Sequence, residues 1–122
     1  MNMEDKLEIF QEMHDKIMHM CEQHWSIAHK YGSVVRFEIE GDYIEYTTED
    51  WLPRGGGVEY DEGRFPIEYL WDENWYETAK AEHEAKEAEK KRKADEEATR
   101  KAVEKEERQY KEYLALKEKY EQ

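Results

Sequence analysis

One segment of 50 residues, from position 73 to position 122, contains neither glycine nor proline, and it constrains the fold more than any other feature. Glycine and proline are the residues that most weaken a helix, so their absence favours one continuous helix. Acidic residues often precede basic residues by four positions here, as Glu97 precedes Lys101. Each such pair stabilises a helix by about 0.2–0.5 kcal/mol. We therefore predict a charged helix, roughly 75 Å long at 1.5 Å per residue, that persists in solvent.

After Tyr76, apolar side chains larger than alanine return only near the end of this segment. Their helical spacing predicts a coiled coil or oligomerisation arm that supports a homodimer. The predicted oligomerisation residues are Val103, Tyr110, Tyr113, Leu114, Leu116 and Tyr120. The alternative is a lone charged helix, because a strong coiled coil needs a longer series of large apolar residues.

The first 30 residues also follow a helical period. Apolar residues recur at steps of three or four, and this spacing predicts an amphipathic helix from about Glu4 to Lys30. The predicted apolar face contains Leu7, Phe10, Met13, Ile17, Cys21, Trp25 and Ala28. Gly32 follows this segment and is typical of a helix C-terminus.

From Ser33 to Thr48 the apolar residues recur at every second position instead of every third or fourth. This alternation is typical of strands. Gly41 and Asp42 lie between two alternating runs and predict a two-residue hairpin turn. The expected pairs on the core face are Ile39 with Ile44, Phe37 with Tyr46 and Val35 with Thr48. A third strand is expected around residues 58–60, after a glycine-rich loop.

These segments predict the α+β class, in which an N-terminal amphipathic helix packs on a small antiparallel β-sheet and a long charged helix follows. We place a compact acidic domain at residues 1–72 and the long helix at residues 73–122. The dense apolar segment from Phe65 to Trp71 is expected to close the core. Trp71 and Trp75 are expected to anchor the long helix to it.

The chain carries a formal net charge of −13, and this charge is unevenly divided. Residues 1–72 contain 17 acids and 6 bases, whereas residues 73–122 contain 15 acids and 13 bases. Nucleic acid and anionic membranes repel such a domain, so its natural complement is a protein with a basic surface. The one cysteine, Cys21, excludes an intramolecular disulfide, and we see no signal peptide or membrane span, so we expect a cytoplasmic protein.

The outward face of the predicted hairpin places Glu38 directly opposite Glu45. Like charges in this position weaken a sheet, so a need for stability does not explain them. The predicted partner-binding residues are Glu38, Glu40, Tyr43, Glu45, Glu49, Asp50, Asp61 and Glu62. The leading hypothesis is a non-enzymatic regulator or inhibitor, such as a phage or mobile-element accessory protein, that mimics DNA on a basic partner. The simpler alternative is that these acids only keep the protein soluble.

A loop of one arginine and three glycines supports a different function, the binding of a nucleotide-like ligand. The predicted ligand-binding residues are Arg54, Gly55, Gly56, Gly57, Trp51 and Tyr60. Glycine amides approach a phosphate closely, and aromatic rings stack on a base. The spacing matches neither a P-loop nor a dinucleotide fingerprint, so glycines that serve a flexible turn are the simpler explanation.

Catalytic and metal chemistry have weaker support. Cys21 and His24 lie three positions apart on the first helix, but a cysteine nucleophile needs a cleft with an oxyanion donor. A structural zinc site normally needs four ligands at recognisable spacing. We expect a buried thiol bordered by histidines, with no metal, no cofactor and no enzymatic activity. A metal-dependent enzyme is the third hypothesis, after the acidic regulator and the small-molecule binder.

Overall fold

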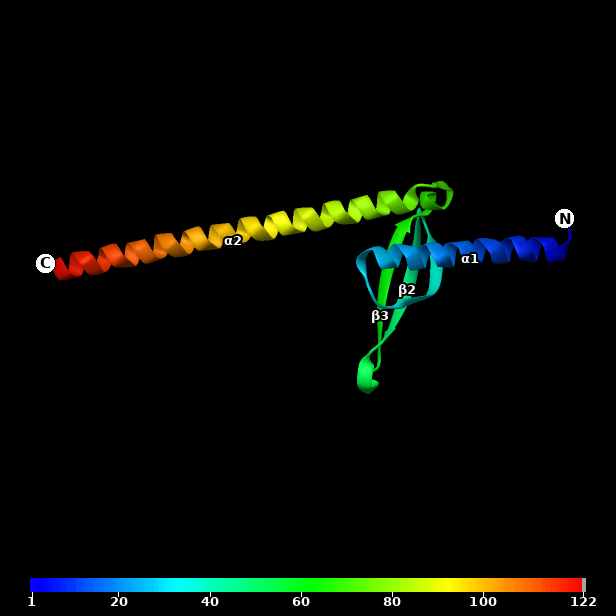
Figure 1. Cartoon of the computed structure of the whole chain (residues 1–122), viewed down its shortest axis with the longest axis horizontal. Helices are drawn as coiled ribbons and strands as arrows, with labels where there is room; N and C mark the ends of the chain where they lie inside the picture. The colour runs from blue at the N-terminus through cyan, green and yellow to red at the C-terminus, as the bar shows by residue number, and fades with distance from the viewer. Residues whose placement is uncertain (122) are drawn as a thin grey trace. The chain divides into compact units, whose positions relative to one another are not determined.

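Residues 1–121 are described by the computed structural model, and their architecture is α+β, as the sequence predicts. The main elements are the helix α1 (Met3–Ala28), the strands β1 (Ser33–Glu40), β2 (Tyr43–Trp51) and β3 (Val58–Pro66), and the helix α2 (Trp75–Glu121). Two short 3-10 helices, η1 (Pro53–Gly55) and η2 (Ile67–Trp71), lie before and after β3. The strands form one antiparallel sheet with β2 at its centre (Figure 1).

The chain divides into two compact units. The first, Met1–His83, contains α1, the sheet and the first turns of α2, and we call it the head. The second begins at Glu84 and contains the rest of α2, which we call the arm. The first turns of α2 therefore belong to the same unit as the sheet.

The core of the head lies between the second half of α1 and the sheet, and η2 and the start of α2 complete it. Its buried residues are Ile17, Met20, Cys21, Trp25, Val34, Ile44, Tyr46, Phe65, Tyr69, Trp75 and Ala79. Aromatic rings fill its centre, since the centroid of the Phe65 ring lies 6.0 Å from that of Tyr69 and 6.1 Å from that of Trp75. Large aromatic side chains thus supply much of the buried apolar area in a small head.

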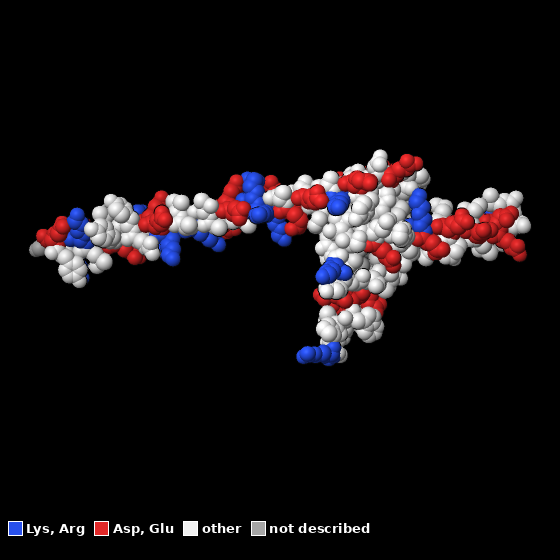
Figure 2. Space-filling view, viewed as in Figure 1, with Lys and Arg blue, Asp and Glu red and all other residues white. Residues whose placement is uncertain are grey.

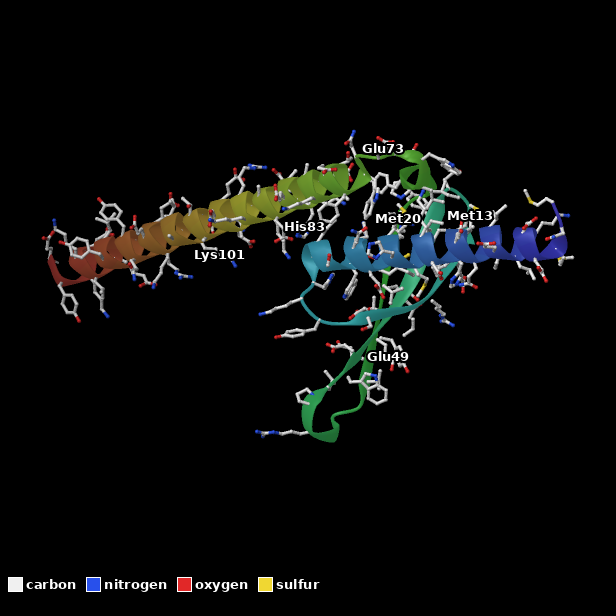
Figure 3. All side chains as sticks on the ribbon, turned by 45° about the vertical axis from the view of Figure 1, so that its right-hand side comes forward. Met13, Met20, Glu49, Glu73, His83 and Lys101 are labelled. Carbon is white, nitrogen blue, oxygen red and sulfur yellow. The ribbon has the colours of Figure 1, made fainter. Side chains whose placement is uncertain are left out.

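Helix α1 is confirmed, but only half of its apolar face is buried. A capping box begins the helix, in which the Asn2 side chain accepts a hydrogen bond from the Asp5 amide (2.9 Å). Met20 is buried, whereas Phe10 and Met13 are exposed (Figure 3 labels both methionines). Helix α1 is about 39 Å long and crosses the strands at a steep angle (Figure 1), so the width of the sheet decides how much of the helix is covered. Three strands about 4.8 Å apart form a sheet that is too narrow to cover the whole of α1.

The β1–β2 hairpin has the predicted turn at Gly41-Asp42, and its register is confirmed over residues 37–40. The predicted pair of Val35 with Thr48 is wrong, because Val34 lies opposite Thr48 instead. Val35 is the extra residue of a β-bulge, and such a residue shifts the alternation of the side chains before it. Val34 is consequently 6% exposed and Val35 is 46% exposed.

Strand β3 is confirmed and longer than predicted, because it runs from Val58 to Pro66 and pairs with the whole of β2. Of the two tryptophans expected to anchor the long helix, Trp75 is buried and Trp71 is exposed. The expectation for Trp71 is wrong because η2 turns Tyr69, two residues earlier, into the core.

Candidate protein-binding surface

The sheet presents one face to the core and the opposite face to solvent, and we call the latter the outer face. Side chains alternate along a strand, so the residues of β2 that flank the buried Ile44, Tyr46 and Thr48 belong to the outer face. Its polar and aromatic members are Arg36, Glu38, Glu40, Tyr43, Glu45, Thr47, Glu49, Trp51, Tyr60, Glu62 and Arg64. Six of the eight predicted partner-binding residues therefore share one face.

The strand register places the charged side chains of the outer face next to one another. Glu38 lies directly opposite Glu45, and Glu45 lies opposite Arg64 on its other side. Arg36 and Glu62 lie in the next row, on either side of β2. Neighbouring strands are about 4.8 Å apart, so each charge is within reach of its neighbours. Five acids and two arginines thus form a patch with an excess of negative charge.

Repulsion within this patch affects Glu45. The pKa of the Glu45 carboxyl group is raised because Glu40 shares a hydrogen bond with it and places a second negative charge beside it. Arg64 acts in the opposite direction as a weaker influence. The patch therefore gathers more negative charge than its own arginines neutralise.

Arg64, the basic residue that β3 contributes to the outer face, was not predicted from the sequence. Its guanidinium group lies over the Tyr43 ring, 4.5 Å from the ring centroid. The alternation that includes Tyr60 and Glu62 continues to Arg64, so the pattern identifies this position once β3 is known to span nine residues. Arg64 both neutralises part of the patch and holds the Tyr43 ring at its edge.

Asp50 and Asp61 do not belong to the outer face. Asp61 lies opposite Thr48 and Asp50 lies opposite Glu59, and these pairs share the side of the sheet on which Thr48 is buried. The Thr48 hydroxyl group donates a hydrogen bond to the Asp61 carbonyl oxygen (3.3 Å). The predicted surface of eight residues is therefore divided between the two sides of the sheet.

The outer face ends in two exposed aromatic rings near the β2–β3 hairpin tip. Trp51 and Tyr60 share this face with Glu49, which lies along β2 between the core and the tip (Figure 3). Trp51 is 74% exposed. Exposed tryptophan and tyrosine are typical anchors of protein interfaces. Two residues predicted for a ligand site thus extend the acidic patch.

The remaining ligand-site residues, at positions 54–57, form the hairpin tip. The Leu52 amide donates a hydrogen bond to the Gly57 carbonyl oxygen (3.0 Å), which closes the loop. Arg54, Gly55 and Gly57 have φ angles of 60°, 71° and 90°, all in the left-handed region. The two glycines therefore serve the turn geometry, whereas Arg54 adopts a conformation that side chains rarely accept.

The exposed first half of α1 adds a second acidic surface to the head. Residues 1–15 contain the five acids Glu4, Asp5, Glu8, Glu12 and Asp15 and the single base Lys6. Figure 2 shows acidic side chains along this part of α1. The head is thus negative on more than one side, so a binding test has to separate the outer face from net charge.

Cys21 lies inside the core rather than in an open cleft. The Cys21 thiol is fully buried, and burial raises its pKa to about 12, so the reactive thiolate is scarce at neutral pH. His24 Nδ1 lies 2.6 Å from the Tyr46 hydroxyl oxygen inside the head. Among residues 1–121, no group of three or more His, Cys, Asp or Glu side chains is arranged to hold a metal ion.

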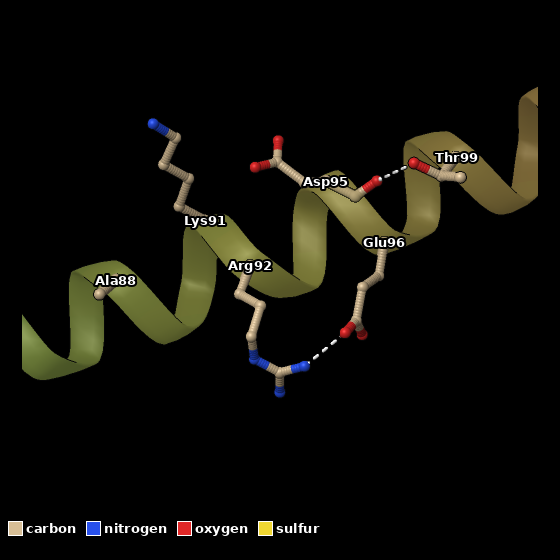
Figure 4. Close-up of a pocket in the computed structure, with 6 residues that line it drawn as sticks. All are labelled: Ala88, Lys91, Arg92, Asp95, Glu96 and Thr99. Carbon is tan, nitrogen blue, oxygen red and sulfur yellow. Dashed lines mark hydrogen bonds and ion pairs between the residues drawn. The ribbon is translucent and has the colours of Figure 1, made fainter.

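Two of the hollows on the described surface offer binding positions away from the outer face. One lies in the head between α1 and η2, where the Lys16 ammonium group donates a hydrogen bond to the Leu70 carbonyl oxygen (2.9 Å) and Trp71 lines the edge. The other lies on the arm and is formed by side chains of one helix, including the Arg92–Glu96 ion pair (Figure 4). A hollow with a single wall encloses too little of a small ligand to bind it tightly.

Comparison with protein-family models, with curated proteins and with solved structures gave no match. Within residues 1–121, no helix is both long enough and apolar enough to cross a membrane. The chemistry of the surfaces described above is therefore the basis for a functional proposal.

Proposed function

We propose that the protein is a non-enzymatic regulator or inhibitor that binds a protein with a basic surface through the outer face. The observation that carries this proposal is the row in which Glu38 lies opposite Glu45, because like charges in such a pair weaken a sheet. Solubility alone does not require this arrangement, since interspersed charges of both signs give solubility without the repulsion.

Recognition by this surface combines charge with an aromatic anchor. Glu38 and Glu45, about 4.8 Å apart across two strands, present adjacent negative charges to lysine and arginine side chains, and the other acids of the outer face add to them. Trp51 and Tyr60 add exposed ring surface at one end of the outer face. Association driven by charge is fast and weakens as the salt concentration rises.

The sharpest form of this proposal is a DNA mimic, in which the outer face occupies the nucleic-acid-binding groove of its partner. Such grooves are lined with lysine and arginine side chains that contact phosphates. The acids of the outer face supply negative charge in place of those phosphates, and the excess of 17 acids over 6 bases in residues 1–72 adds long-range attraction. By analogy with accessory inhibitors of phages and mobile elements, we place this protein in that class.

A pull-down of the tagged full-length protein from host lysate, at low and at high salt, is the first test. The expected result is one basic or nucleic-acid-binding protein that is retained at low salt and released at high salt. Added duplex DNA is expected to release it as well, because DNA competes for the same groove. The absence of any retained protein would contradict the proposal.

Two double variants with equal charge changes separate the outer face from net charge. Glu38→Lys with Glu45→Lys reverses two charges on the outer face, and Asp50→Lys with Asp61→Lys reverses two on the other side of the sheet. Only the first is expected to lose the partner, while circular dichroism shows an unchanged helical signal in both. Loss of the partner from both variants alike would point to net charge rather than to the outer face.

A second candidate function is the binding of a nucleotide-like ligand by the tip loop, next to Trp51 and Tyr60. The observation that favours it is the φ of 60° at Arg54, because strained backbone of this kind clusters at ligand sites. A thermal-shift screen that includes cyclic nucleotides detects such a ligand, since binding raises the melting temperature. A shift that Arg54→Ala abolishes would support this function. A metal-dependent enzyme is the third candidate, and stoichiometric metal in the purified protein is its test.

A further inference from the structure

The end of the arm carries a seam of residues that are spaced alternately by three and four positions. The seam residues are Val103, Glu106, Tyr110, Tyr113, Lys117 and Tyr120. This spacing is that of the a and d positions of a heptad repeat, which meet a partner helix in a coiled coil. Leu114 and Leu116 lie on either side of the seam and widen it. Four seam residues are apolar or aromatic, and the other two carry opposite charges.

The apolar side chains of the seam are uncovered in the single chain. Their exposed fractions, together with those of the flanking leucines, range from 43% at Leu114 to 79% at Tyr120. In its described residues the arm consists of α2 alone, so it has no second element of its own to bury them. A contiguous apolar surface of this kind marks an interaction site.

We propose that a second copy of this chain covers the seam in an antiparallel arrangement. A two-fold axis between residues 111 and 112 pairs every seam residue with a seam residue of the other copy. Val103 then meets Tyr120, Glu106 meets Lys117 and Tyr110 meets Tyr113, and each pair occurs twice. Tyrosine suits these positions because its ring is buried while its hydroxyl group reaches the edge of the seam.

Charge complementarity selects both the second copy and the antiparallel orientation. In this orientation Glu106 faces the opposite charge of Lys117 at two places in the dimer. A parallel pairing in register instead brings Glu106 against its own copy and Lys117 against its own copy, which is repulsive within a seam. Lys117 is available for this contact, because in the single chain its ammonium nitrogen lies 3.9 Å from the carboxylate of Glu121 in an exposed pair that contributes little.

The charge of the arm also permits self-association, whereas the charge of the head opposes it. Residues 84–121 contain 12 acids and 12 bases, and Figure 2 shows the two signs interspersed along the arm. Antiparallel pairing places the two copies of Val103 roughly 17 residues apart along the seam, which is about 25 Å. This distance exceeds the Debye length of about 8 Å at physiological salt. The segments that precede the seam therefore leave it in opposite directions without repelling each other.

A charge-swap cycle on the full-length chain tests the partner and the orientation together. Analytical ultracentrifugation over a wide range of protein concentrations measures the dissociation constant of the dimer. Glu106→Lys and Lys117→Glu are each expected to weaken the dimer at least about tenfold, because each places like charges at two contacts. The double variant restores opposite charges and is expected to return to within about threefold of the unmodified protein.

Two control variants make the same charge changes on the outward side of the helix. Glu118→Lys and Lys105→Glu are expected to leave the dimer unchanged, and circular dichroism checks that every variant keeps its helix content. A protein that stays monomeric at all concentrations would overturn the proposal. A dimer whose single charge-swap variants behave like the controls would overturn the antiparallel register. Neither result bears on the outer face, because no seam residue belongs to it.

Discussion

Phe10 and Ile17 lie on the same face of α1, two turns apart, and their different burial predicts different outcomes for the same substitution. Ile17 is 6% exposed and Phe10 is 69% exposed. Ile17→Ala empties part of a packed core, and such a change costs about 2–5 kcal/mol of unfolding free energy. Phe10→Ala removes a larger side chain that is already mostly in water, so we expect a change within about 0.5 kcal/mol. The higher helix propensity of alanine offsets part of even that loss.

Urea denaturation followed by tryptophan fluorescence measures these differences, because Trp25 and Trp75 are buried in the core. Circular dichroism is less suitable, since the arm adds a large helical signal that does not report on the head. Equal large losses for both variants would show that the first half of α1 is packed as tightly as the second half. That result would refute the conclusion that the core covers only the second half of α1.

Two further predictions concern the sheet. Gly63 lies opposite Tyr46, and a β-carbon added at Gly63 would collide with the Tyr46 ring. Gly63→Ala is therefore expected to lower the free energy of unfolding by about 1–3 kcal/mol in urea, and full stability would show that the ring moves aside without cost. The raised pKa of Glu45 predicts that Glu45→Gln increases stability at neutral pH. A glutamate with a raised pKa in the folded state destabilises the fold as the pH rises above 4.5, the ordinary pKa of its carboxyl group. Thermal unfolding is expected to show that the gain disappears at about pH 3, where the carboxyl group is protonated in both states; a gain at every pH would exclude the charge as its cause.

The elements of this fold were predictable because their signals are local. The three-to-four spacing from Leu7 to Trp25 identifies α1, and the Gly41-Asp42 turn sets the hairpin register. The periodicity does not show how much of each apolar face is covered by neighbouring elements. Ile39 follows the alternation of the core face yet is exposed, because it lies near the end of β1. The bulge at Val35 has no residue signature, and only the tertiary packing of its neighbour reveals it.

The candidate surface was predictable to the same degree. Glu38 opposite Glu45 follows from the hairpin turn alone, so the sequence identifies the centre of the patch. The register between β2 and β3 places Arg64 on the outer face and Asp61 on the opposite side of the sheet. The length of the loop between these strands does not predict that register. Local patterns thus predicted the centre of the acidic face. Its boundary and its basic residue Arg64 are identified only when the position of the third strand is known.

The proposed binding role of the outer face and the proposed dimer at the seam together predict a bivalent protein. A dimer joined at the seam presents two outer faces, so a partner displayed in many copies is bound through two contacts at once. The second contact is intramolecular, and the gain in avidity reaches about 10²–10⁴ where the geometry allows both. Glu106→Lys breaks the seam but leaves the outer face intact, so it is expected to weaken binding to a densely immobilised partner and not to a soluble monomeric one. Equal weakening in both formats would show that Glu106 contacts the partner itself, and the two surfaces would then not be independent.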